Sequence, residues 1–479
     1  MSNTDFSKNA EIGYMSAMEL SSSYARGDLS ATEVTKAVLA RIDEVNPHLN
    51  AFAVMTPELA LADAKKADED RAKGISKPLL GIPVTIKDAY DVAGFKTETG
   101  SNWLAGTTGV ASEDNVVVKR LRDAGAVVLG KTTTSEMAWS GLSYSPRTGI
   151  THNPFAKGLN AGASSAGAAV AAAAGFGPLH LGSDGGGSIR MPAHFCSIYG
   201  LKPTYGRVPH VPVSNNDYGT HIGPMTRTVA ESAIMLRIMA GPHYLDHTSS
   251  ETPPPDYFSA LGASMKGKRI AFSIDLGHAR VDPDVEKSIR AAADVFASLG
   301  ATVEEVTPSW GPKGVDLARF FWAAKEARRL SILPEWEDRM GPDFVACMRA
   351  GADYTSADYL LRRQDKYDYI AEMQTFLEDW DFLLTPAASV TAFPPKQMRP
   401  DHWPQHDWDW MAWAEFMYPF NFSGNPAAVI PCGFDTAGLP VGLQIVGQRF
   451  DDLGVLQASA AFEQALPVYK TRPTFESYK

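Results

Sequence analysis

A chain of 479 residues with 44% hydrophobic composition is long enough to bury a large core. Its formal net charge of −11, without a basic block, argues against nucleic acid as a partner. Three cysteines without a CxxC spacing exclude a disulfide framework and favour a reducing compartment, so we expect a cytoplasmic protein. The sequence predicts neither a signal peptide nor a membrane span, because it has no apolar N-terminal region and no run of about 18 apolar residues.

The first 75 residues have the pattern of a helical segment. Ser16 and Ser30 are each followed three residues later by a glutamate, which is the capping box that begins a helix. Thr56-Pro57 predicts the start of a third helix that ends near Gly74. We expect residues 1–75 to pack onto something larger.

An apolar run from Leu80 to Ile86 predicts a buried strand that ends in Lys87 and Asp88. Burying an ammonium group is costly unless it is paired or neutralised. The local pattern leaves two interpretations open. Either the Lys87 ammonium reaches water or pairs with Asp88, or it is kept neutral for chemistry.

The middle and end of the chain alternate between helix and strand patterns. A helix is expected at 113–124 and a strand at 126–129, followed by a turn at Gly130-Lys131-Thr132. Further helices are predicted near 228–240, 282–299, 315–330, 356–380 and 451–465, and strands near 269–274, 302–306 and 382–386. Segments 427–431 and 440–446 have the pattern of a hairpin. This alternation predicts an α/β layered sheet, which the hairpin makes mixed rather than all parallel.

Two clusters of serine and small residues lie between Leu159 and Pro209, at 162–167 and 182–190. Between them the chain is almost all Ala, Gly and Val, which predicts a buried helix. Three glycines that end at Ser188 leave backbone N–H groups uncovered beside a hydroxyl, the pairing that acyl transfer needs. A GGGS run by itself is more often a glycine turn with solvated serines.

Taken together, these motifs resemble those of the amidase signature family. Residues 184–193 match its D-x-G-G-S-I-R-x-P cluster, and residues 81–88 match its G-x-P-x-x-x-K-D motif. The cluster at 162–167 departs from the family pattern, with Ala163 and Ala166 where glycine is usual. The serines that carry the chemistry are intact.

The resemblance implies a three-layer α/β/α fold, in which helices surround a large mixed central sheet. It also implies that residues 1–479 form a single domain, with the signature core at 80–210 and the rest of the sheet and the substrate-pocket region at 211–479. Matches are densest at 80–210, return at 419–465 and are weak at 210–415. The resemblance leaves a homodimer open.

The resemblance further assigns catalytic roles. Ser188 would be the nucleophile, Lys87 the ultimate base, and Ser164 a proton relay preceded by a cis peptide bond. Lys87 must be neutral to accept a proton, so burial would have to lower its pKa from about 10.4 by about 3 units, or ~4 kcal/mol. No metal or cofactor is implied. No histidine is needed either, although the sequence leaves His194 open as a member of a Ser-His-Asp triad.

Three supporting groups of residues come from the same resemblance. The oxyanion hole would be formed by the N–H groups of Gly185, Gly186, Gly187 and Ser188. The loop would be braced by Asp184 and Arg190. The scissile bond would lie near Ala138, Trp139 and Ser140, although for Trp139 packing in the core is an equally good interpretation.

One further segment, 401–410, places His402 and His406 among three aspartates, a pattern that metal ligands share. Pro404 opposes the regular helix that would bring the two imidazoles together. Four tryptophans between 403 and 413 favour an aromatic loop that rims a pocket.

The sequence therefore favours an amidase that hydrolyses a small-molecule carboxylic amide to an acid plus ammonia or an amine. The alternative, from the same family, is the component of a tRNA-dependent amidotransferase that releases ammonia from glutamine. Its typical R-x-D-G-x-R-Y-G segment is absent, and residues 322–340 occupy the comparable region. A noncatalytic nucleotide-binding protein would need G-x-G-x-x-G after a strand, which 182–187 does not match. A catalytically dead scaffold is disfavoured because Lys87, Ser164 and Ser188 are all present.

Overall fold

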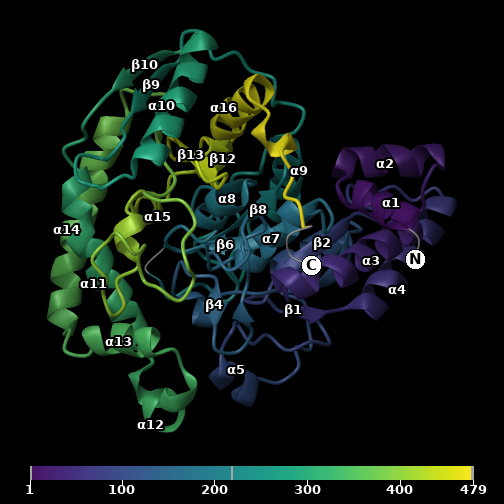
Figure 1. Ribbon diagram of the computed structural model, residues 1–479, viewed down its shortest axis with the longest axis horizontal. Helices are drawn as coiled ribbons and strands as arrows, with labels where there is room; N and C mark the ends of the chain where they lie inside the picture. The colour runs from purple at the N-terminus through teal and green to yellow at the C-terminus, as the bar shows by residue number, and fades with distance from the viewer. Residues whose placement is uncertain (1–2, 217–218, 476–479) are drawn as a thin grey trace.

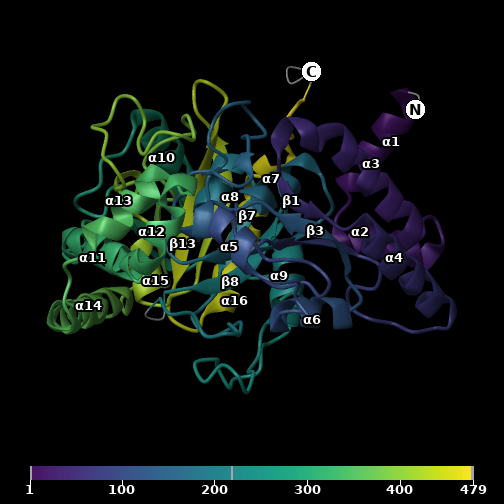
Figure 2. The same ribbon diagram turned by 90° about the horizontal axis from the view of Figure 1, so that it is seen from below.

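A single eleven-stranded sheet crosses the protein (Figures 1 and 2). The structure is a computed structural model that describes residues 3–216 and 219–475; residues 1–2 of the predicted N-terminal segment lie outside it. In sheet order the strands are β1 (Phe52–Met55), β3 (Val127–Thr132), β2 (Pro83–Lys87), β6 (Leu179–Asp184), β8 (His221–Thr226), β7 (Tyr199–Lys202), β12 (Ala427–Phe434), β13 (Pro440–Gly447), β11 (Phe382–Pro386), β9 (Arg269–Phe272) and β10 (Thr302–Glu305). A separate two-stranded ribbon pairs β4 (Tyr144–Ser145) with β5 (Gly149–Ile150).

The sheet is mixed, as the sequence predicts. Strand β2 runs parallel to β3 and β6, and β9 runs parallel to β10 and β11. The strands between these two parallel groups are antiparallel, including the predicted hairpin of β12 and β13. The predicted α/β fold class is confirmed.

Helices cover both faces of this sheet. The longer ones are α1 (Asn3–Gly13), α2 (Ala17–Arg26), α3 (Ala31–Leu49), α4 (Pro57–Ala72), α6 (Val116–Asp123), α7 (Ala166–Ala174), α8 (Arg190–Cys196), α9 (Val229–Met239), α10 (Pro283–Ser298), α11 (Gly314–Ala327), α13 (Pro342–Ala350), α14 (Ser356–Leu377) and α16 (Asp452–Ala465). The shorter ones are α5 (Asn102–Thr107), α12 (Leu333–Trp336) and α15 (Tyr418–Phe422). A Cβ at Gly442 of β13 would lie 3.1 Å from His194 Cα of α8, whereas one at Gly447 would lie 2.6 Å from Val455 of α16. Helices α8 and α16 therefore pack on opposite faces of the same strand, because successive side chains of a strand alternate between its faces.

The N-terminal helices pack beside β1 and β3, at the opposite end of the molecule from α11 and α14 (Figure 1). Both predicted capping boxes are present: the Ser16 and Ser30 hydroxyls accept from the N–H groups of Glu19 and Glu33, and each glutamate accepts in return. Helix α1 and the short strand β1 were not predicted. A four-residue strand gives too short a pattern to separate it from a loop.

Every residue of α7 is buried, as the run of small side chains predicts. Gly167 in its first turn lies so close to the residues that flank β1 and β3 that a Cβ there would be 2.1 Å from Ala51 O and 2.5 Å from Thr133 N. Since Ser164 and Ser165 immediately precede this helix, the close approach fixes where both serines lie relative to the ends of β2 and β3.

The predicted turn at Gly130-Lys131-Thr132 is wrong. These residues form the end of β3, because β1 pairs with one edge of the strand and β2 with the other. Because β3 is paired on both sides, it continues to Thr132, beyond the apolar run at 126–129 from which the strand was predicted. Among the described residues, none of the helices has the length and apolar character needed to span a bilayer.

Replacing Gly167 by Ala should destabilise the protein by about 1–3 kcal/mol, because the added methyl group has no space against the backbone of Ala51 and Thr133. Urea denaturation followed by circular dichroism measures the loss. Gly109→Ala is the control, since nothing lies within 4 Å of a Cβ at that position. Equal stability of the two variants would contradict the packing argument.

Candidate active site

Lys87 ends β2 with its side chain fully buried. Its Nζ atom donates to the hydroxyl oxygens of Ser164 at 2.7 Å, Ser165 at 2.9 Å and Ser183 at 3.1 Å. The Ala163–Ser164 peptide bond is cis. Lys87 and Ser164, which lie 77 residues apart in the sequence, are thus in direct contact.

The surroundings of Lys87 favour its neutral form. Burial, the largest effect, lowers the pKa of Lys87, the Asp184 charge opposes this, and the Lys325 charge lowers the pKa again; together they give a pKa of about 7. A lysine with this pKa holds a substantial neutral fraction near neutral pH and is able to accept a proton.

The neighbouring carboxylate does not neutralise Lys87. Asp88 instead pairs with Lys131 of β3, with 2.7 Å between Lys131 Nζ and Asp88 Oδ1, and both side chains are buried. Asp88 also accepts from the backbone N–H of Thr99 at 3.0 Å. The local alternative of a Lys87–Asp88 pair is therefore wrong, because the strand pairing of β2 with β3 brings a second buried lysine to the aspartate.

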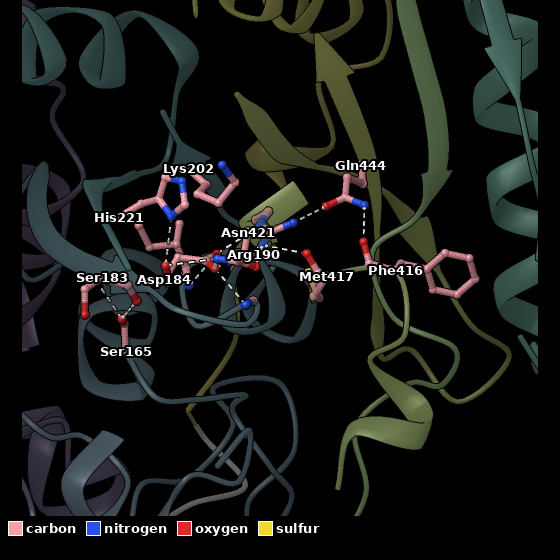
Figure 3. A network of polar contacts seen from close by, with 12 residues as sticks. Ser165, Ser183, Asp184, Arg190, Lys202, His221, Phe416, Met417, Asn421 and Gln444 are labelled. Atoms are coloured by element: carbon pink, nitrogen blue, oxygen red, sulfur yellow. Dashed lines mark hydrogen bonds and ion pairs between the residues drawn. The ribbon is translucent and has the colours of Figure 1, made fainter. Parts of the chain in front are cut away.

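The loop that carries Ser188 is held by a buried ion pair (Figure 3). Arg190 donates to Asp184 through Nε at 2.9 Å and through Nη2 at 3.0 Å. The Asp184 carboxylate also accepts from the backbone N–H groups of Gly187 and Ile189, which lie within the loop. Burial raises the pKa of Asp184, but the charge and hydrogen bonds of Arg190 outweigh this and hold that pKa well below its usual range.

This ion pair connects the loop to the C-terminal part of the chain (Figure 3). Arg190 donates to Gln444 Oε1 of β13 at 2.7 Å and to Asn421 Oδ1 of α15 at 2.6 Å. Asn421 in turn donates to Asp184 Oδ1 at 2.8 Å. In the sequence Asn421 stands out only as part of a glycosylation sequon and Gln444 carries no signal; the fold alone brings them here, across 237 and 254 residues.

The loop amides differ in what they contact. Gly187 N–H donates to Asp184 Oδ1 at 2.7 Å, so this amide already has an acceptor, and its place in the oxyanion hole stays a prediction. Within the described residues the N–H groups of Gly185, Gly186 and Ser188 have no protein acceptor. Gly187 has φ +108°, and a Cβ there would lie 2.5 Å from Met417, so the position requires glycine.

The nucleophile candidate lies beside the lysine cluster. Ser188 is 4% exposed, and its carbonyl accepts from Ser165 N–H at 3.1 Å, which joins the two serine clusters. Two further serines, Ser165 and Ser183, belong to this cluster although no role was predicted for them. Ser165 Oγ donates to Ser183 O at 3.1 Å, and both hydroxyls contact Lys87. Their positions inside the two serine-rich motifs were the available signal.

His194, left open by the sequence, is a structural residue. It is fully buried, accepts from Gly442 N–H at Nδ1 and donates from Nε2 to Val390 O. Burial lowers the pKa of His194 to about 4. Both ring nitrogens bond to backbone, which leaves neither for a serine triad.

A cavity of about 180 Å³ adjoins the loop at Gly185 and Gly186. Its aromatic wall consists of Phe321, Trp322, Tyr359, Tyr418 and Phe422. Its basic residues are Lys325, Arg328 and Lys366. The cavity is therefore apolar and aromatic with cationic groups at its wall.

The predicted substrate-binding residues lie elsewhere. Trp139 and Ser140 line a second, wider cavity of about 640 Å³ together with Glu136 and Asp343, and Ala138 lines neither cavity. Trp139 is also stacked on Phe344 with 5.3 Å between ring centres, in agreement with the packing interpretation. In this second cavity, burial raises the pKa of Glu136 to about 8.

Residues of the tryptophan-rich segment line both cavities, Met411 the first and His406 the second. Trp410 and Trp413 are buried, Trp410 contacts Trp322 edge-on at 5.4 Å, and Trp413 Nε1 donates to Met398 O on the side of the second cavity. His402 contacts the Asp282 carboxylate, while His406 accepts backbone N–H bonds from residues 408 and 409. In the described ranges no group of three or more His, Cys, Asp or Glu is arranged to hold a metal.

Comparison with known proteins gives consistent matches along the chain. A family model described as amidase matches residues 33–456. An acylamidase of Rhodococcus erythropolis is 38% identical over 478 residues, covering 96% of this chain and 98% of its own. A glutamyl-tRNA(Gln) amidotransferase subunit of Chloroflexus aggregans is 35% identical over 491 residues, covering 97% and 99%. The crystal structure of a bacterial aryl acylamidase of the amidase signature enzymes matches with a TM-score of 0.89 at 27% identity, covering 96% and 99%.

Asp184→Asn should destabilise the protein by about 3–5 kcal/mol at pH 7, because it leaves the Arg190 charge buried without its counter-ion. The folded pKa of Asp184 lies below its unfolded value, so the wild-type advantage is present above about pH 4 and is lost as the pH falls. Urea unfolding at pH 7 and at about pH 2.5, below the unfolded pKa of an aspartate, measures both effects. As a control, Asp123→Asn breaks the exposed pair with Lys119 and should change the free energy of unfolding by less than about 0.5 kcal/mol. If Asp184→Asn lost no more stability than this control, the bracing role of Asp184 would be refuted.

Proposed function

The chain belongs to the amidase signature family, and on that basis we propose that it hydrolyses a carboxylic amide to an acid plus ammonia or an amine through an acyl-Ser188 intermediate. The observation that carries the proposal is the 2.7 Å contact between Lys87 Nζ and Ser164 Oγ in a buried cluster of serine hydroxyls. A pKa of about 7 for Lys87 supports its role as base.

In the proposed acylation step, Ser188 Oγ attacks the carbonyl carbon as its proton passes to Ser164 and the Ser164 proton passes to neutral Lys87. The carbonyl oxygen becomes an oxyanion, for which the N–H groups of Gly185, Gly186 and Ser188 are the candidate donors. Asp184 and Arg190 contribute by holding the loop in shape. The C–N bond then breaks, and the proton returns through Ser164 to the leaving nitrogen.

In the proposed deacylation step, a water molecule takes the place of the leaving amine. Its oxygen attacks the acyl carbon, and one of its protons passes through Ser164 to Lys87. The bond to Ser188 Oγ breaks, Ser188 regains a proton and the carboxylic acid is released. Lys87 therefore begins and ends the cycle neutral, which is why its burial matters.

For the substrate, the proposal is an acyl amide with an apolar or aromatic portion. Two observations support it: similar proteins include an acylamidase and an aryl acylamidase, and the cavity beside Gly185 has five aromatic side chains in its wall. The amidotransferase component is the alternative, because a protein of that name is 35% identical over nearly the whole chain. The missing R-x-D-G-x-R-Y-G segment favours the free amidase.

We expect kcat/KM to rise with pH through an apparent pKa near 7, because only neutral Lys87 accepts a proton. Lys87→Met should retain less than about 0.1% of the activity. The folded pKa of Lys87 lies below its unfolded value, so wild-type stability should increase relative to Lys87→Met as the pH rises from about 7 to about 10. pH–rate profiles and urea unfolding test both effects. If Lys87→Met kept activity and its kcat/KM still rose with pH through the same apparent pKa, Lys87 would be excluded as the base.

Wild type should hydrolyse at least one member of a panel of primary amides, anilides and peptide-like amides, and Ser188→Ala should hydrolyse none. Mass spectrometry of the released acids and amines measures turnover. Equal turnover by the two proteins would show that Ser188 is not the nucleophile. Glutamine is included in the panel, since ammonia release from glutamine alone would favour the amidotransferase.

A further inference from the structure

The charged side chains that line the cavity beside Gly185 and Gly186 are all cationic among the described residues. Lys325 and Arg328 line it from α11 and the residue after that helix, and none of the described lining residues is an aspartate or glutamate. Most of the remaining wall is apolar or aromatic, with Asn215, Asn216 and Lys366 among its polar side chains. Lys325 is half-buried in this wall whereas Arg328 is exposed, so the Lys325 charge is the less solvated of the two and interacts more strongly with a ligand.

Lys325 is fixed in place rather than free to turn toward solvent. Its side chain is 14% exposed, its Nζ lies 3.9 Å from the ring centre of Trp322, and it lies 2.9 Å from Glu326 Oε1. Trp322 is the ring that packs against Gly186: a Cβ at Gly186 would lie 3.0 Å from it. The ammonium is thus anchored within one aromatic side chain of the loop that ends at Ser188.

One carboxylate serves two cations at this wall. Glu326 is fully buried and pairs with both Lys325 and Arg329. Arg328 uses Nη1 to donate to Asn215 O at 2.9 Å, a bond that does not neutralise its charge. Counting Lys325, Arg328 and Arg329 against Glu326 leaves two net positive charges among these four residues.

This charge also reaches the catalytic candidates. The Lys325 charge lowers the pKa of Lys87, so the cavity wall and the serine cluster lie within one electrostatic field. A ligand that occupies the cavity with its reacting carbonyl at the loop would place its far end near Lys325.

We propose that the cavity selects anionic amides: an apolar or aromatic body lies against Trp322 and its neighbouring rings, and a carboxylate away from the scissile bond pairs with Lys325 and Arg328. A neutral ligand would cover these cations without a counter-charge, which is unfavourable, whereas a carboxylate offsets the loss of hydration. The proposal rests on the proposed function, because it names the substrate class of the same site.

Two matched substrate pairs test it, since the carboxylate belongs to either the acyl or the amine side. The first is glutaryl 4-nitroanilide against 5-methylhexanoyl 4-nitroanilide, and the second is 4-acetamidobenzoate against 4-isopropylacetanilide. In each pair an isopropyl group replaces a carboxylate of similar shape. Wild type should prefer the anionic member of at least one pair in kcat/KM by about tenfold or more.

Lys325→Met should remove about tenfold of that preference. The ratio within a pair, measured at pH 8, cancels any effect of Lys325 on Lys87, because both members need the same base. Lys119→Met on α6, whose exposed ammonium pairs with Asp123, should leave the ratio unchanged. A preference for the neutral member in both pairs, or an unchanged ratio in Lys325→Met, would overturn the proposal.

A binding measurement separates this proposal from the proposed chemistry. Ser188→Ala should bind benzoate at least about tenfold more tightly than benzamide, as followed by tryptophan fluorescence, and the double variant Ser188→Ala/Lys325→Met should lose the difference. If the wild type hydrolysed no amide but the two variants showed this binding pattern, the hydrolytic function would be rejected and the anion site would be kept. Equal binding of benzoate and benzamide would reject the anion site whatever the activity.

Discussion

The buried pair of Asp184 and Arg190 is the interaction on which the rest of the site depends. An ion pair without solvent access is tolerated only when hydrogen bonds satisfy the remaining donors and acceptors. Here the loop amides of Gly187 and Ile189 satisfy the carboxylate, while Gln444 and Asn421 satisfy the guanidinium. The pair therefore holds the Ser188 loop to α15 and β13. In the sheet, β13 is separated by four strands from β2, the strand that carries Lys87.

A second constraint is the way in which buried charges are shared among neighbouring strands. Two lysines, Lys87 and Lys131, are buried at the ends of adjacent strands, and within the described part of the chain only Lys131 has a carboxylate partner, Asp88. Lys87 contacts serine hydroxyls instead, which accept its hydrogen bonds but supply no negative charge to offset the cost of burying an ammonium group. Because Asp88 pairs with Lys131, the two adjacent strands hold one lysine in an ion pair and one lysine with a pKa of about 7.

The two cavities around the site differ in the groups that line them. Trp322, Trp410 and Trp413 are in successive ring contact; Trp322 lines the cavity at Gly185, and Met398, whose carbonyl accepts from Trp413, lines the wider cavity at Trp139. The first cavity carries cations at its wall, whereas the second contains the buried carboxyl group of Glu136. The first cavity therefore offers cations to a ligand, whereas the Glu136 carboxyl of the second is largely protonated near neutral pH, because burial raises its pKa to about 8.

The sequence by itself determined the features that depend on neighbouring residues: capped helices at Ser16 and Ser30, the buried small-residue helix α7, the mixed sheet, and the motif positions of Lys87, Ser164 and Ser188. These follow from spacing along the chain, which sets periodicity and capping directly. The tertiary structure alone decided that Asp88 pairs with Lys131 and that the Gly187 N–H donates to Asp184. It also decided that Gln444 and Asn421 bond to the Asp184–Arg190 pair and that Lys325 lies at the cavity wall. Such contacts join positions up to 254 residues apart, and no local pattern specifies which strands and helices will bring them together.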